Sequence, residues 1–128
     1  DFNPPASNPN PIGLRASPDA LPGPATGLAS WYSHAFEGRR TASGEPYSRY
    51  EMTAAHRTLP FGTMVCVRSQ ITGRGVVVRI NDRGPHAANR VVDLSRGAAE
   101  ALGMVGLGLK PVELFALQDD DKDCPAAP

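Results

Sequence analysis

Metal-binding and membrane-spanning patterns are both missing from this sequence of 128 residues. Neither of its two cysteines, Cys66 and Cys124, belongs to a CxxC motif or to a His/Cys cluster, which excludes the ligand spacing of a zinc site. No apolar run is long enough to cross a bilayer, and no signal-peptide pattern begins at Asp1. We therefore expect no metal, no cofactor and no transmembrane segment.

The two cysteines leave two possibilities open. Cys66 lies in an apolar, strand-like stretch, and Cys124 lies 58 residues further along in a polar tail. In an oxidising compartment a Cys66–Cys124 disulfide would pin the tail to the domain and contribute about 4 kcal/mol through loop-closure entropy. The alternative is two free thiols, one buried and one in a disordered tail. We predict the disulfide.

Charge is balanced overall but not along the chain. Thirteen Lys and Arg side chains match thirteen Asp and Glu side chains. Residues 27–117 hold eleven of the basic and seven of the acidic side chains, so this part is mildly basic. Such an excess suits an acidic polymer, although ordinary solubility explains it as well. We expect no nucleic-acid partner.

The sequence divides into three parts. Seven of the thirteen prolines fall in the first 24 residues, so residues 1–26 are expected to be an extended arm or linker that buries too little apolar surface to fold. Residues 118–128 contain four aspartates and read as an acidic, solvated tail. Residues 27–117, about 90 residues, are long enough for one small core.

Residues 75–85 are expected to organise this domain. Val76–Ile80 is a nearly continuous β-branched run, which is typical of a strand buried on both faces. The run stops at Asn81-Asp82, and Gly84-Pro85 then forces a turn. Asp82 therefore lies at the rigid end of a core strand, where a scaffold can hold a reactive group. On local grounds alone, an Asp that binds turn amides fits the same pattern.

Short strands dominate the rest of the domain. The segments with strand patterns are 27–33, 63–68, 76–80, 90–94 and 111–117. The second and third are separated by a Gly-containing turn, Thr72–Gly75, and should form a hairpin. Five or six short strands with long Gly- and Pro-bearing loops predict a small β-barrel.

Helical signals are few. Arg96–Leu102 is expected to be a helix because Ser95 suits its N-cap and Gly103 its C-terminal stop. Met52–Leu59 is expected to form a single helical turn that ends before a proline. Asp93, just before the cap, is expected to accept hydrogen bonds from backbone amides.

Five motifs together resemble the rare lipoprotein A family and cover about residues 27–117. The motifs are Gly27–Tyr32, Thr41–Glu45, Thr53–His56 with Leu59–Thr63, Asn81–Pro85 and Arg90–Ser95. The resemblance implies a mainly β fold, a small six-stranded double-psi β-barrel with one or two short helices, as in expansins. It also implies endolytic cleavage of the MurNAc–GlcNAc bonds of bacterial peptidoglycan, preferably in peptide-stripped strands, to 1,6-anhydro-MurNAc ends.

The resemblance also implies a set of site residues. Asp82 matches the acid/base position, with Glu45 and His56 as supporting groups. We further expect that residues in or beside these motifs bind the glycan, namely Tyr32, Ser43, Asn81 and Arg83.

A single acid/base group is chemically coherent for this reaction. Glycoside hydrolases generally need two carboxylates, because one must activate water or form the covalent intermediate. A sugar whose own 6-hydroxyl attacks its anomeric carbon brings a tethered nucleophile with high effective molarity. One group can then protonate the leaving oxygen and afterwards accept the hydroxyl proton. We expect Asp82, Glu45 and His56 to share protonation.

The expected setting is the periplasm or cell envelope, with any signal peptide already removed. No glycan-binding repeat follows residue 117 and no lipid-accepting cysteine lies near Asp1, so we expect neither that targeting module nor a lipid anchor. The Pro-rich arm could dock to an envelope protein complex. Two alternatives to the enzyme remain: an expansin-like barrel that binds glycan without breaking it, and a structural barrel within an envelope complex.

Overall fold

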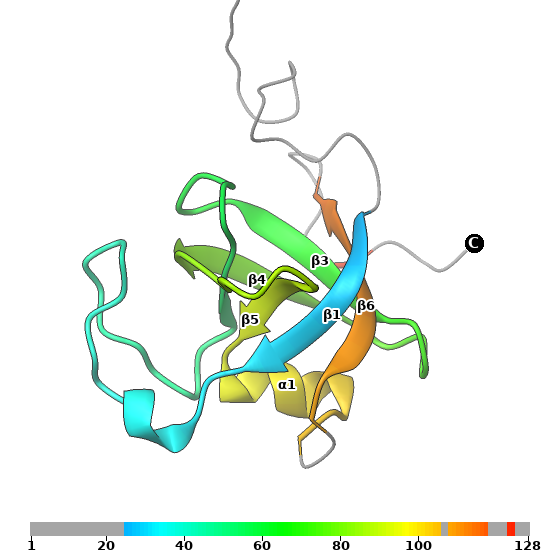
Figure 1. The fold of residues 1–128 in the computed structure, drawn as a ribbon, viewed down its shortest axis with the longest axis horizontal. Helices are drawn as coiled ribbons and strands as arrows, with labels where there is room; N and C mark the ends of the chain where they lie inside the picture. Colours follow the sequence, from blue (N-terminus) through cyan, green and yellow to red (C-terminus); the bar gives the residue numbers. More distant parts are fainter. Residues whose placement is uncertain (1–24, 106–107, 118–122, 125–128) are drawn as a thin grey trace, which may run out of the picture.

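The computed structural model describes residues 25–105, 108–117 and 123–124. Six strands close into one barrel (Figure 1). Around the barrel their order is β1-β5-β2-β4-β3-β6. They are β1 (Ala25–Trp31), β2 (Thr53–Ala55), β3 (Met64–Ser69), β4 (Gly75–Asp82), β5 (Arg90–Leu94) and β6 (Lys110–Ala116). A 3-10 helix, η1 (His34–Phe36), follows β1, and one α-helix, α1 (Arg96–Leu102), follows β5.

The barrel mixes parallel and antiparallel pairs. β1 runs parallel to β5 and β2 runs parallel to β4, while the other four strand contacts are antiparallel. The β3–β4 contact is the expected hairpin, in which Cys66 lies opposite Val77. The predicted six-stranded double-psi β-barrel with one or two short helices is thus confirmed. Within the described residues, no helix is long and apolar enough to cross a membrane.

β4 is buried on one face, not on both as its composition predicted. Val76, Val78 and Ile80 point into the core, whereas Val77 and Arg79 alternate with them and are only half-buried. In a closed barrel of this size one face of every strand fills the interior and the other faces outward. The end of the strand lies as predicted, because β4 finishes at Asp82 and Gly84 then adopts a φ of +132°.

The predicted helical turn over Met52–Leu59 is wrong. Residues Thr53–Ala55 form β2 instead, a short strand whose three residues are all buried. β2 lies between β4 and β5, and Ala54 pairs with Ile80 on one side and Leu94 on the other. Two sets of strand hydrogen bonds outweigh the local preference of an alanine-rich stretch, because tertiary context overrides weak propensity.

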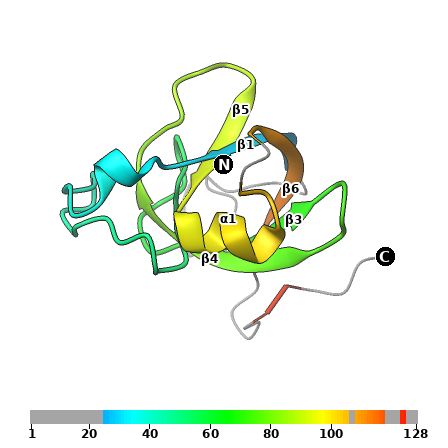
Figure 2. The ribbon, with the colours of Figure 1, turned by 90° about the horizontal axis from the view of Figure 1, so that it is seen from below.

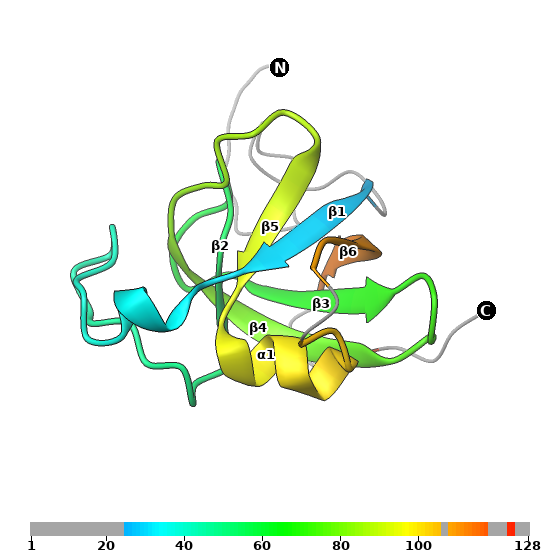
Figure 3. The same ribbon diagram turned by 60° about the horizontal axis from the view of Figure 1, so that its bottom comes forward.

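α1 has the bounds and caps that the sequence predicted. The Ser95 hydroxyl accepts a hydrogen bond from the Ala98 N–H at 3.2 Å, and Gly103 ends the helix with a φ of 76°. Ala98, Ala99 and Leu102 are buried and join the core cluster. The helix thereby covers one end of the barrel (Figures 2 and 3).

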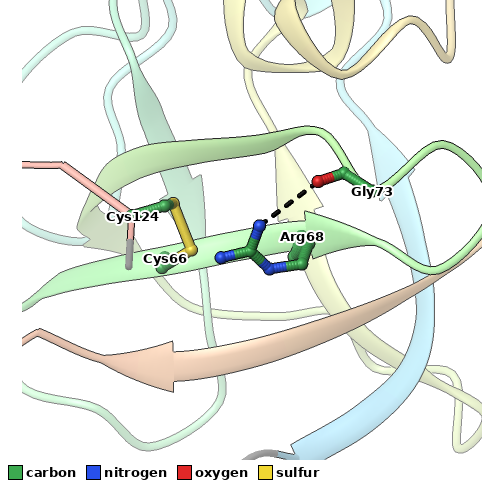
Figure 4. The surroundings of a disulfide bond; sticks show 4 residues. All are labelled: Cys66, Arg68, Gly73 and Cys124. Atoms are coloured by element: carbon green, nitrogen blue, oxygen red, sulfur yellow. Dashed lines mark hydrogen bonds between the residues drawn. A yellow bond between two sulfur atoms is a disulfide. The ribbon is translucent and has the colours of Figure 1, made fainter. Parts of the chain in front are cut away.

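The Cys66–Cys124 disulfide is present in the structure (Figure 4). The two Cα atoms lie 5.2 Å apart, in the usual range for a bridged pair. Cys66 is fully buried although its neighbours on β3, Val65 and Val67, are the residues that enter the core cluster. Cys124 therefore packs against the outer side of the β3–β4 hairpin, where a Cβ atom on Gly75 would lie only 2.9 Å from its Sγ.

The barrel begins at Ala25, which pairs with Leu114 of β6, so it starts two residues before the predicted domain boundary at Gly27. The rest of the predicted Pro-rich arm, residues 1–24, lies outside the described residues, as does the acidic tail apart from Asp123 and Cys124.

Candidate active site

Asp82 ends β4 with its carboxylate held by three donors. Its Oδ1 accepts hydrogen bonds from the backbone N–H groups of Ala42 and Arg83, both at 2.9 Å. Its Oδ2 accepts a hydrogen bond from the Tyr32 hydroxyl. The expected hydrogen bonds from turn amides to Asp82 are present, and its half-buried carboxylate lies at the end of a core strand; its reactivity stays a prediction.

The loop Thr41–Glu45 brings Ala42 to Asp82. It is folded back on itself, because the Thr41 N–H donates to the Glu45 carbonyl and the Gly44 N–H to the Thr41 carbonyl, each at 2.9 Å. Gly44 has a φ of +98°, which favours glycine. The Ser43 N–H then donates to the Asn81 carbonyl at 3.1 Å and joins the loop to the end of β4.

The Glu45 carboxylate is paired with a cation of the same strand that ends in Asp82. Arg79 Nη1 donates to both carboxylate oxygens of Glu45, at 2.7 and 3.0 Å, and Asn81 Nδ2 donates to one of them at 3.1 Å. The hydrogen bonds from Arg79 and then Asn81 hold the pKa of Glu45 below its ordinary value. Glu45 is therefore ionised near neutral pH.

His56 follows β2 and has a defined tautomer. Its Nδ1 accepts hydrogen bonds from the backbone N–H groups of Thr58 and Leu59, both at 3.1 Å. A nitrogen that accepts carries no proton, so the neutral ring holds its proton on Nε2. The His56 backbone N–H donates to the Asp82 carbonyl at 3.1 Å, which sets the two residues side by side.

The guanidinium of Arg83, a residue predicted to bind glycan, makes its contacts with other residues of the protein. Its Nη1 donates to the carbonyls of His56 at 3.1 Å and Leu59 at 2.8 Å, and its guanidinium lies 4.1 Å from the centre of the Phe61 ring. These contacts fasten the loop after β2 to the loop after β4.

Arg57 makes the reciprocal connection. Its Nε donates to the Pro85 carbonyl at 2.7 Å, and its Nη2 donates to the carbonyls of Ala87 and Arg90, the latter at 2.8 Å. We call Arg57 and Arg83, with the loops 56–61 and 83–90 that they join, the arginine clasp. It was not foreseen from the sequence, where the only sign is an arginine beside each of His56 and Asp82.

Tyr32 sits in an aromatic cluster. Its ring stacks on Tyr47 with centres 4.6 Å apart and meets the edge of Phe36 at 5.4 Å. Burial raises the pKa of Tyr32 far above its ordinary value, and the hydrogen bond to Asp82 and the charges of Asp82 and Asp93 raise it further. Tyr32 is therefore a neutral donor at any pH at which the protein works.

Asp93 differs from its predicted role. Its Oδ1 accepts a hydrogen bond from the Ser30 hydroxyl, a partner opposite to it in the parallel β1–β5 pair, and no backbone amide among the described residues donates to its side chain. Strand pairing across the barrel decides this contact, which local sequence cannot show.

The predicted site residues thus form one connected region. Tyr32, Ser43 and Asn81 contact Asp82 or its loop, and His56 is joined to Asp82 through the backbone. Glu45 reaches Asp82 only through Asn81 and its own loop, among the contacts of the described residues. No group of three or more His, Cys, Asp or Glu side chains within the described ranges is arranged to hold a metal ion.

Comparison with known proteins gives matches over most of the described domain. A family model described as "Lytic transglycolase" matches residues 24–114. The protein named "Probable endolytic peptidoglycan transglycosylase RlpA" of Synechocystis sp. is 55% identical over 92 residues, which are 72% of this chain and 29% of that protein. The "Endolytic peptidoglycan transglycosylase RlpA" of Campylobacter jejuni is 48% identical over 90 residues, 70% of this chain and 33% of that protein. The chain spans about a third of the length of these curated relatives.

Solved structures share the barrel. The Streptomyces papain inhibitor superposes with a TM-score of 0.61 at 22% identity, over 77% of this chain and 99% of its own. The apo expansin of Clavibacter michiganensis gives a TM-score of 0.59 at 25% identity, over 82% of this chain and 53% of its own. These likenesses concern the fold.

Proposed function

Because this chain belongs to the lytic transglycolase family, we propose that it is an endolytic lytic transglycosylase of peptidoglycan with Asp82 as its general acid and base. The observation that carries the proposal is the Asp82 carboxylate, held by three donors at the end of β4. Its setting is the periplasm or cell envelope, and its substrate is a glycan strand, preferably one without stem peptides. An envelope complex that engages residues 1–26 belongs to the same proposal.

The reaction needs one group that gives and regains a proton. Protonated Asp82 donates its proton to the glycosidic oxygen as the bond from that oxygen to C1 of MurNAc breaks. The 6-hydroxyl oxygen of the same MurNAc then bonds to C1, and its proton passes to Asp82. The products are a 1,6-anhydro-MurNAc end and a free GlcNAc 4-hydroxyl, and Asp82 returns to its starting state without the consumption of water.

Glu45 and His56 support this chemistry in different ways. Glu45, ionised and bound to Arg79 and Asn81, cannot supply the proton, so its role is to fix the loop that carries Ala42. His56 is held by two backbone hydrogen bonds to its Nδ1, and its own N–H donates to the Asp82 carbonyl, so its role is to fix the loop after β2 beside the general acid and base.

Asp82→Asn tests the assignment. The amide keeps the size of the side chain but has no transferable proton, so anhydro ends should form about 10²–10⁴ times more slowly while the thermal unfolding midpoint changes little. Mass spectrometry of the products from peptide-stripped glycan measures this, with Asp123→Asn, an exposed aspartate far along the chain, as the matched control.

Three other outcomes would contradict the proposal. Reducing ends in place of anhydro ends would mean hydrolysis. A well-folded Asp82→Asn protein that cleaves at the wild-type rate would remove Asp82 from the mechanism. Intact strands after incubation with the wild type would favour the glycan-binding or structural barrel.

A further inference from the structure

The two oxygens of the Asp82 carboxylate are not equivalent. Oδ1 accepts two hydrogen bonds, from the Ala42 and Arg83 backbones, and Oδ2 accepts one, from Tyr32. Each carboxylate oxygen offers two lone-pair directions. Among the contacts of the described residues, both directions of Oδ1 are occupied and one direction of Oδ2 is open.

The Tyr32 hydroxyl is fixed in this position by packing. The Tyr32 ring stacks on Tyr47 at an interplanar angle of 13° and makes a T-shaped contact with Phe36. Tyr47 is 4% exposed, and its hydroxyl accepts a hydrogen bond from the Arg96 N–H at 3.0 Å at the start of α1. Tyr32 is half-buried, and its stacking on the buried Tyr47 holds the orientation of its ring, so the hydroxyl cannot swing away from Oδ2 without breaking that stacking contact.

We propose that Tyr32 is a positioning residue for the general acid and base: it occupies one lone pair of Asp82 Oδ2 and leaves the other as the only place from which the proton is exchanged with the glycan. The inference rests on the proposed transglycosylase activity and names a role within it. It gives Tyr32 a role other than the expected binding of the glycan, because its hydroxyl already donates to Asp82.

The hydrogen bond from the Tyr32 hydroxyl to Asp82 strengthens during the reaction. While Oδ2 carries the proton, it is a weak acceptor for the Tyr32 hydroxyl. Once the proton has moved to the glycosidic oxygen, Asp82 is a carboxylate and the same hydrogen bond becomes charge-assisted. A donor aimed at the atom where charge develops favours the transition state over the ground state.

Tyr32→Phe separates this role from glycan binding. The substitution keeps the ring and its stacking but removes the donor, so kcat should fall about 10- to 100-fold while KM stays within about twofold. Tyr50→Phe is the matched control, because Tyr50 is 78% exposed and should keep wild-type kcat and KM. A raised KM with unchanged kcat would mean that Tyr32 binds glycan, and two unchanged constants would mean that it has no part in the reaction; either result overturns the proposal.

A second measurement tests the hydrogen bond without activity. The 13Cζ resonance of Tyr32 should move when Asp82 takes up a proton during an acid titration, and this movement should vanish in Asp82→Asn. A wild-type resonance that does not move overturns the proposal. If the wild type releases no anhydro product, both the proposed function and this catalytic role of Tyr32 are wrong. If the Tyr32 resonance still moves in that case, the hydrogen bond to Asp82 is present and the error lies in the assigned reaction.

Discussion

Glu45 influences Asp82 through the backbone of its own loop. Its carboxylate binds Arg79 and Asn81 on β4, while the loop that ends at Glu45 delivers the Ala42 N–H to Asp82. Loss of the Glu45 charge should therefore loosen the loop and displace one of the three donors to Asp82. The expected cost to catalysis arises from this displacement and not from a missing proton.

Glu45 should also make stability depend on pH. Its pKa is lowered in the folded state from an unfolded value of 4.5, chiefly by Arg79. The stabilisation is therefore fully present above about pH 4.5 and is lost as pH falls through the lower, folded-state pKa. We expect the wild type to unfold at a higher temperature than Glu45→Gln at pH 7, and the difference to shrink on acidification below pH 4.5.

The control for this experiment is Glu100→Gln. Glu100 pairs with Arg96 one helical turn away on the exposed side of α1, and such surface pairs contribute little. Its substitution should change the midpoint only slightly at either pH. A Glu45→Gln difference that is the same at pH 7 and in acid would show that the lost hydrogen bonds, and not the charge, account for it.

At the scale of loops and strands, the arginine clasp holds the surroundings of Asp82 and His56 together. Each of the loops 56–61 and 83–90 contributes an arginine and, in return, offers carbonyls to the arginine of the other loop. A guanidinium satisfies several carbonyls at once, which a lysine ammonium cannot do in the same fixed geometry. Residues 56–61 and 83–89 have no strand or helix of their own, so these hydrogen bonds hold their backbones in place.

Arg57→Lys should weaken the clasp while keeping the charge. We expect a loss of about 1–2 kcal/mol in the free energy of unfolding, since hydrogen bonds to the Pro85, Ala87 and Arg90 carbonyls cannot all survive. Amide hydrogen exchange should become faster in residues 83–90, and cleavage should slow because Asp82 precedes this loop. The control is Arg74→Lys, because Arg74 is an exposed arginine in the β3–β4 turn. If both substitutions change the free energy of unfolding and the rate of cleavage equally, the arginine clasp has no specific role.

Local signals predicted some elements and could not predict others. α1 was predictable because Ser95 and Gly103 lie in the sequence next to the ends that they cap. β2 was not, because its pairing partners are on β4 and β5 and only the closed barrel brings them together. The candidate site divides in the same way: the strand pattern placed Asp82, but its donors Tyr32 and Ala42 lie 50 and 40 residues earlier in the chain.

At the scale of the whole molecule, the disulfide fixes Cys124 to the outside of the barrel. It joins residues 58 positions apart (Figure 4). Cys124 packs against Gly75 at the start of β4. A loop of this length should contribute about 4 kcal/mol by restricting the unfolded chain. Gly75 provides the necessary space, since any side chain there would meet the Cys124 sulfur.

Protein produced in an oxidising compartment should contain no reactive thiol, which labelling under denaturing, non-reducing conditions measures. Cys124→Ala should lower the free energy of unfolding by about 2–4 kcal/mol. Gly75→Ala should destabilise the oxidised protein by about 1 kcal/mol or more, because its Cβ would lie 2.9 Å from Sγ of Cys124. In the Cys124→Ala background the same substitution should be neutral or stabilising. Two labelled thiols per chain would contradict the Cys66–Cys124 disulfide. Equal effects of Gly75→Ala in both backgrounds would contradict the packing of Cys124 against Gly75.

The pairing of β1 with β6 also sets the order of events as the chain is made. β1 has two neighbours, β5 and β6, and both lie late in the sequence: Leu28 meets Arg90 on one side, and Ala25 meets Leu114 on the other. A chain that emerges from the ribosome with its N-terminal end first must therefore hold β1 unpaired until residues 90–94 have appeared, and its other edge stays open until residues 110–116 follow. The barrel then closes over a long loop, a slow type of step. Until that moment the barrel stays open along β1 and β3, the two strands that β6 joins, and their unpaired edges are available to chaperones.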